Sequence, residues 1–124
     1  MSGRLYSNQN PDFQHHDVRG DLTQLVHGGY SQINFVTTKA GSFRGGHYHK
    51  QNRELFNIIR GEVEFTLESR DERERAAFSD GGMFSIPPWV RHSFTYVKDT
   101  EMITMYDCGV ELGDGKMDIY EDWE

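Results

Sequence analysis

The feature that most constrains this chain is a two-residue alternation of apolar and polar side chains. In residues 62–68, EVEFTLE, the three apolar residues fall on one side of an extended chain, and the glutamates and Thr66 fall on the other. This period is typical of a half-buried β-strand. Residues 30–38, 54–61, 92–97 and 101–106 are also rich in β-branched and aromatic side chains. Many short strands, separated by turn sequences, predict an all-β sandwich or barrel.

The remaining segments are assigned from charge and composition. The chain has 124 residues, which favours a single domain. We expect that domain at residues 17–110, an N-terminal arm at 1–16, and an acidic tail at 111–124 that Ile119 and Trp123 could pin to a neighbour. Residues 69–78, SRDERERAAF, are expected to form a charged hairpin loop rather than a helix.

The bulk composition excludes several classes of function. A formal net charge of −7 is unfavourable for binding nucleic acid or an anionic membrane surface. No apolar run is as long as a membrane span, and the N-terminal residues contain no apolar secretion signal. Cys108 is the only cysteine, so no intrachain disulfide can form. Together these observations predict a cytoplasmic protein.

A pair of histidines next to two glycines is the first candidate for chemistry. His47 and His49 are two residues apart, so on a strand both side chains point to the same face. Glu54 opens the next apolar strand, where a carboxylate needs solvent, a partner or a ligand. His92 begins a further strand. Three imidazoles and a carboxylate could bind one transition metal ion, although two histidines in a β protein are more often ordinary surface or core residues.

The spacing of these residues resembles the two signature motifs of the cupin superfamily. Residues 41–61 read G-x5-H-x-H-x4-E-x6-G, which matches the first motif at every marked position. Residues 81–96 are similar to the second motif, G-x5-P-x-G-x2-H-x3-N, with Trp89 in place of the glycine and Tyr96 in place of the asparagine. The resemblance implies a cupin jelly roll.

The cupin resemblance also implies a ligand set and an assembly. The positions of the family's metal ligands fall on His47, His49, Glu54 and His92. The cofactor expected there is one divalent transition metal ion, and iron, manganese, zinc, nickel and copper all remain open. Cupins of this kind pair as homodimers, often by exchanging or adding edge strands, and the N-terminal arm is the expected donor here.

Strand parity and charge suggest further site residues. Tyr96 shares a face with His92, and Tyr106 could project inward from the following strand, so both are candidate proton donors, although core packing is an equal alternative. Arg44 and Arg91 lie close to the two motifs and could bind an anionic substrate, or pair with surface acids. Asn57 is a further polar candidate in an otherwise apolar strand.

A closer likeness concerns residues 17–61. They are similar to cupins of sugar-nucleotide and polysaccharide pathways, including deoxysugar 3,5-epimerases and 3,4-ketoisomerases, whose R-G-x-H pattern matches Arg44, Gly45 and His47. This resemblance implies His47 as a catalytic base, with no metal required. Glu54 and His92 nevertheless complete a ligand set that this comparison does not require, so we predict a metal-binding cupin that isomerises or epimerises a small anionic carbonyl compound such as a sugar nucleotide. The alternatives are an Fe(II)-dependent dioxygenase and a cupin that only binds a small ligand.

Overall fold

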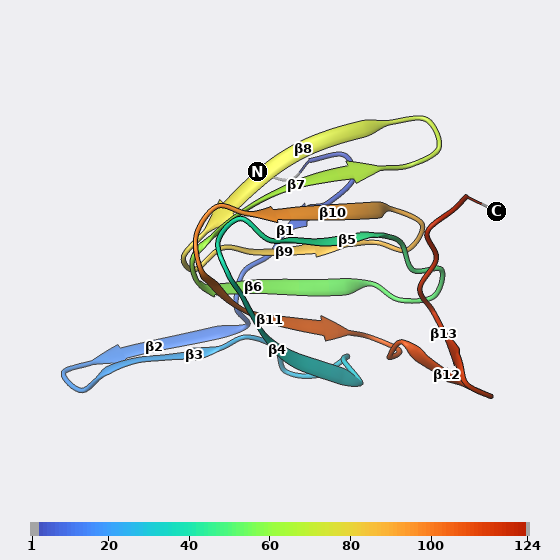
Figure 1. Ribbon diagram of the computed structural model, residues 1–124. Coiled ribbons are helices and arrows are strands. Elements are labelled where there is room, and N and C mark those ends of the chain that lie inside the picture. Colours follow the sequence, from blue (N-terminus) through green and yellow to red (C-terminus); the bar gives the residue numbers. More distant parts are fainter. Residues whose placement is uncertain (1–2, 124) are drawn as a thin grey trace.

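The alternating segments form two antiparallel sheets in the computed structural model, which describes residues 3–123 (Figure 1). The larger sheet has five strands in the spatial order β1 (Ser7–Asn8), β9 (Met83–Ile86), β6 (Glu54–Arg60), β11 (Thr100–Tyr106) and β4 (Gln32–Thr38). The second has four strands in the order β5 (Phe43–His47), β10 (Arg91–Tyr96), β7 (Glu62–Glu68) and β8 (Arg73–Ser79). This arrangement confirms the all-β jelly-roll prediction.

Two hairpins lie outside these sheets. The first pairs β2 (Phe13–Asp17) with β3 (Gly20–Gln24), and it extends away from the rest of the molecule in Figure 1. The second pairs β12 (Glu111–Gly113) with β13 (Lys116–Met117) near the C-terminus. Residues 3–123 include no helix that is both long and apolar enough to cross a membrane.

The main hydrophobic core lies between the two sheets. Phe65 of β7 stacks on Phe84 of β9, with ring centroids 4.7 Å apart, and so joins the four-stranded sheet to the five-stranded one. Phe56, Phe94 and Tyr96 are buried in the same cluster. Side chains that alternate along each strand supply this layer, because successive residues of a strand point to opposite faces. Burial of these aromatic rings removes a large apolar area from water and stabilises the sandwich.

The structure corrects one expectation about the charged segment. Residues 69–78 were expected to form a loop, but only the turn at its start is irregular, and Arg73–Ser79 is strand β8. Glu74, Ala76 and Phe78 are partly buried while their neighbours are exposed, which is the alternation of a half-buried strand. Cross-strand pairing with β7 outweighs the low strand propensity of the charged residues.

The terminal segments pack against the barrel. Strand β1 pairs with β9 of the same chain, and Leu5 is part of the main core. The expected boundary between residues 16 and 17 falls within β2, whose last residue is Asp17. Trp123 stacks on the buried ring of Tyr48, with centroids 4.7 Å apart, whereas Ile119, the other residue expected to pin the tail, is 39% exposed.

Gly45 allows the close approach of β5 to β10 next to the histidines. Its φ is 98°, and a Cβ added there would lie 2.6 Å from the main-chain oxygen of His92. Gly46 also has a positive φ, of 81°, but a Cβ there would only touch the Phe43 ring at 3.8 Å. Comparing Gly45 with Gly46 therefore separates the effect of backbone conformation from the effect of close packing.

Replacing each glycine with alanine tests this geometry. We expect Gly46→Ala to lower the free energy of unfolding by about 1–2 kcal/mol through its left-handed conformation alone. Gly45→Ala should cost about 1–3 kcal/mol more, because the methyl group forces β5 and β10 apart. Urea unfolding of both variants measures the difference, and equal costs would contradict the close approach.

Candidate metal and active site

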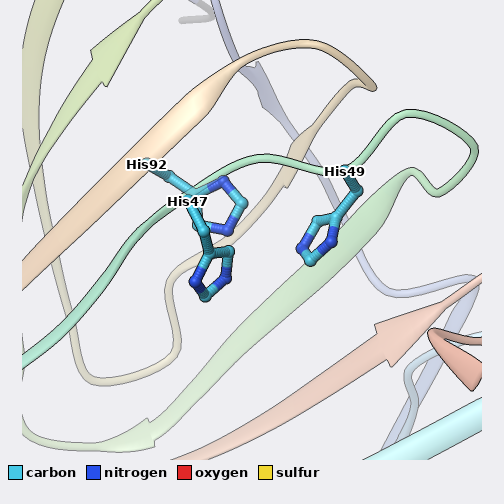
Figure 2. Close-up of side chains that lie close together, drawn as sticks. All are labelled: His47, His49 and His92. Atoms are coloured by element: carbon cyan, nitrogen blue, oxygen red, sulfur yellow. The ribbon is translucent and has the colours of Figure 1, made fainter. Parts of the chain in front are cut away.

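The three histidines of the motifs converge at one end of the barrel. His47 is the last residue of β5, and its cross-strand partner is His92 of β10. His49 follows on the same face as His47, and Figure 2 shows the three rings gathered together. Ring centroids are 4.8 Å apart for His47 and His92, 5.1 Å for His49 and His92, and 5.2 Å for His47 and His49. One nitrogen from each ring lies within 4.8 Å of the others, which is close enough to share an ion.

Glu54 completes the group from the opposite sheet. It is the first residue of β6 and only 4% exposed. Its Oε1 atom lies 3.2 Å from His49 Nε2 and 3.5 Å from His92 Nε2. The structure therefore brings all four predicted ligands together, from three different strand regions.

Hydrogen bonds at the far side of two rings determine how they face this carboxylate. His49 Nδ1 lies 2.7 Å from the main-chain oxygen of Asp118, and His92 Nδ1 lies 3.1 Å from that of Val90. A carbonyl oxygen only accepts, so each Nδ1 carries the proton. When the rings are neutral, the Nε2 lone pairs of His49 and His92 both point toward Glu54. Two lone pairs and the negative charge of the carboxylate then meet in a buried space.

Such a group needs a proton or a cation at its centre. His92 Nε2 is buried and makes no hydrogen bond to any residue in 3–123. Metal ions bind neutral imidazoles whose other nitrogen donates to a carbonyl, as both rings do here. The residues present therefore fit a divalent transition metal, although metal binding itself stays a prediction.

Burial controls the protonation of these groups. It lowers the pKa of His47 to about 4, with a smaller contribution from His49, and it lowers the pKa of His92 well below its usual value. Burial also lowers the pKa of His49, but the hydrogen bond and charge of Glu54 outweigh it and the net shift is upward. Burial raises the pKa of Glu54. Without a metal, the two upward shifts favour a proton held between His49 and Glu54, while His47 stays neutral.

A cavity of about 150 Å³ opens beside the histidines. Its polar lining comes from both sheets and consists of Asn34, Arg44, His47, Glu54, His92, Tyr96, Thr104 and Tyr106. Burial raises the pKa of Tyr96, and burial together with the nearby Glu54 carboxylate raises the pKa of Tyr106. Both phenols therefore remain protonated at neutral pH and face the same space as His47.

Two predicted substrate-binding residues do not line this cavity. Asn57 is buried on the face of β6 opposite Glu54, because the two residues are an odd number of positions apart. Arg91 precedes His92 and lies on the outer face of β10, where its Nε donates to the main-chain oxygen of Gly46 at 3.3 Å. Strand parity therefore places both side chains away from this cavity. Arg44, in contrast, reaches the cavity.

The sequence-based prediction missed two groups of site residues. Asn34 lines the cavity from β4, and its even spacing from Val36, which also lines it, could have shown that it faces inward. Asp118 and Asn52 hold the loop that carries His49. No local pattern marks Asp118, because it stands among many other acidic residues in the tail.

The two facing sheets, with histidines and a glutamate at one end, define a cupin-type jelly roll. The chain belongs to the polysaccharide biosynthesis C-terminal domain family, whose model matches residues 15–119. A curated relative, UDP-2-acetamido-2,6-beta-L-arabino-hexul-4-ose reductase of Pseudomonas aeruginosa, is 30% identical over 101 residues. The match covers 73% of this chain but only 26% of that relative, so the chain spans about a quarter of its length.

Similar solved structures show the same fold. A sugar 3,4-ketoisomerase from Thermoanaerobacterium thermosaccharolyticum in complex with TDP is 18% identical, with a TM-score of 0.79 over 97% of this chain and 90% of that one. The dTDP-4-dehydrorhamnose 3,5-epimerase from Sulfolobus tokodaii is 17% identical, with a TM-score of 0.66 over 82% of this chain and 74% of that one. These likenesses confirm the predicted cupin fold.

The lowered pKa of His47 predicts how stability depends on pH in the metal-free protein. The unfolded chain takes up a proton near pH 6.5, whereas the folded chain does so near pH 4. Between these values the unfolded state binds more protons, so stability is lost as pH falls. We expect His47→Gln to lose less stability than the wild type between pH 7.5 and pH 5 in urea unfolding with a chelator. His27→Gln, at an exposed histidine, is the control; parallel curves for wild type and His47→Gln would contradict the buried neutral ring.

Proposed function

We propose that this chain is an isomerase or epimerase that acts on a keto sugar nucleotide. The observation that carries the proposal is the cavity in which a neutral imidazole, two protonated phenols and an arginine face one another. The fold is shared with sugar 3,4-ketoisomerases and a 3,5-epimerase, whose names support the same class of substrate. The polysaccharide biosynthesis family supports it as well.

The side chains suit proton transfer next to a carbonyl group. A neutral His47 can accept a proton from the carbon beside the carbonyl, since its pKa of about 4 leaves the lone pair available at neutral pH. The negative charge that develops on the carbonyl oxygen requires a donor, and the hydroxyl of Tyr96 or Tyr106 can supply one. In isomerisation the proton is then delivered to the former carbonyl carbon, while the adjacent hydroxyl gives its proton to the phenolate and becomes the new carbonyl. In epimerisation a donor on the opposite side protonates the same carbon on its other face, and the phenol recovers its proton as the carbonyl re-forms.

Arg44 is placed to bind an anionic part of the substrate. Its Nε donates to Thr38 Oγ1 at 2.8 Å, and one terminal nitrogen donates to the Thr37 main-chain oxygen at 3.2 Å. These bonds fix the guanidinium at the cavity and use two of its five N–H groups. The remaining donors suit a phosphate or carboxylate. A structural neighbour bound to TDP is consistent with such a ligand.

A divalent metal bound by His47, His49, His92 and Glu54 would polarise the substrate carbonyl. A ring nitrogen cannot bind an ion and accept a proton at once. In a metal-loaded chain His47 would be held as a ligand and the protonated phenols could only donate, so His47 could act as the base only in the metal-free chain. Replacing His47 would therefore remove the base in the metal-free chain and a ligand in the metal-loaded chain.

Deuterium exchange tests the proposed reaction. A dTDP-4-keto-6-deoxyhexose incubated with the protein in D2O should gain deuterium at a carbon next to the carbonyl, as observed by NMR. His47→Asn should slow the exchange by about 10²- to 10⁴-fold, because it removes the base or one metal ligand. His27→Asn, away from the cavity, should leave the rate unchanged. No exchange with keto sugar nucleotides, combined with oxygen uptake in the presence of Fe(II), would contradict the proposal and favour a dioxygenase.

The projecting hairpin supports assembly as a homodimer. A two-stranded hairpin is at best marginally stable alone, and Phe13 and Leu22 of β2 and β3 are exposed. Strand β4 is an edge strand of the larger sheet, and its outer side chains Ile33 and Phe35 are 61% and 63% exposed. A second copy can cover this apolar edge with its own hairpin, and two-fold symmetry makes the contact reciprocal.

Light scattering after size exclusion tests the dimer. The wild type should elute with twice the chain mass of 14.4 kDa. Phe35→Asp should shift it to a monomer, because it puts a charge into the apolar contact. Phe43→Asp is the matched control, since Phe43 is equally exposed but belongs to the other sheet. A wild type with the mass of one chain would contradict the assembly.

A further inference from the structure

The carboxylate of Asp118 accepts four hydrogen bonds near the site, although this residue belongs to the C-terminal tail. Its side chain is fully buried. One carboxylate oxygen accepts a hydrogen bond from the main-chain N–H of Lys50, at 2.9 Å. The other accepts the main-chain N–H groups of Gln51 and Asn52, at 3.0 and 3.1 Å, and the Asn52 side-chain amide at 2.8 Å. One tail residue thus fixes three successive residues of the loop that follows His49.

The same residue also contacts His49 directly. Its main-chain oxygen accepts the Nδ1–H of His49 at 2.7 Å, in a fully enclosed environment. This bond sets the ring orientation and leaves Nε2 facing Glu54 at 3.2 Å. The carboxylate and the carbonyl of Asp118 therefore hold the loop and the ring at the same time.

We propose that Asp118 is a positioning residue that fixes His49 in the Nδ1–H tautomer and so aims its Nε2 lone pair at the centre of the site. The inference rests on the proposed function only in treating His49 as part of that site. Burial raises the pKa of Asp118, but the hydrogen bonds from Asn52, Lys50 and Gln51 outweigh it, and the net shift is downward. The carboxylate is thus charged at neutral pH and able to accept every one of these bonds.

Neighbouring contacts hold Asp118 in place. Asn52 links it to residues 108 and 109, because its side-chain oxygen accepts their two main-chain N–H groups at 3.0 and 2.8 Å. Beyond Asp118, Tyr120 forms an antiparallel bridge with Tyr48. The Tyr48 hydroxyl donates to the main-chain oxygen of Asp122 at 2.8 Å. In Figure 1 the end of the chain runs past the end of β5, as these contacts require.

The tautomer of His49 provides a readout that does not depend on turnover. In the metal-free wild type, long-range ¹H–¹⁵N correlation of the imidazole at a pH where the ring is neutral should show the proton on Nδ1. Free histidine favours the other tautomer, so this result identifies the acceptor bond. A neutral His49 with its proton on Nε2 would overturn the proposal without any substitution.

Asp118→Asn tests the role of the carboxylate with little change in shape. The introduced asparagine places amide N–H donors against the main-chain N–H donors of residues 50–52. The loop should therefore loosen, and His49 should populate both tautomers. Binding of Co²⁺, followed by its visible absorption, should weaken by about 10- to 100-fold, as for other residues that orient metal ligands. Asp114→Asn removes the same charge from an exposed position of the tail and should change neither measurement.

The outcomes separate this inference from the proposed reaction. A folded Asp118→Asn protein with an unchanged His49 tautomer and unchanged Co²⁺ affinity would overturn the positioning role. If that variant does not fold, Asp118→Glu takes its place, since it keeps the charge but moves the main chain relative to His49, and the same two changes are expected. A failure of deuterium exchange in a wild type with the Nδ1–H tautomer would refute the proposed function alone.

Discussion

The structure of the site depends on electron pairs that converge in a buried space. Carbonyl groups of Val90 and Asp118 hold the protons of two imidazoles on Nδ1, so their Nε2 atoms face the Glu54 carboxylate. In a medium of low dielectric constant this arrangement is unfavourable unless a positive charge lies between the groups. A proton shared by His49 and Glu54 supplies only part of that charge, because His92 Nε2 still has no hydrogen-bond partner among the described residues. A divalent cation would satisfy both.

The fold brings these groups together from distant parts of the chain. Strand β5 supplies His47, β10 supplies His92 as its cross-strand partner, and β6 supplies Glu54 from the other sheet. The aromatic core between the sheets fixes their separation. Trp89 adopts a φ of 67° at the position where the cupin motif has glycine, and its N–H donates to the main-chain oxygen of His49 at 2.7 Å. The cost of about 1–2 kcal/mol for this conformation is offset by that bond and by stacking on Tyr48.

Much of this could be predicted from the sequence, because strand alternation and motif spacing are local signals. They gave the sandwich, the convergence of the three histidines and Glu54, and the inward face of Tyr96. The face occupied by Asn57 could not be predicted, because a buried strand has apolar residues on both faces and polarity does not reveal which face lines the cavity. Asp118 was missed because its role depends on contacts with residues 66 to 69 positions earlier in the chain, which no local pattern records.

The metal content of the protein tests the central claim most directly. Elemental mass spectrometry of protein purified without added metal, repeated after incubation with Zn²⁺ or Fe²⁺ and dialysis, measures the ions bound per chain. We predict about one transition metal ion per chain in the wild type and almost none in a folded protein carrying both His49→Ala and His92→Ala. A wild type that retains no ion even after incubation, or a double variant that retains as much as the wild type, would contradict the account.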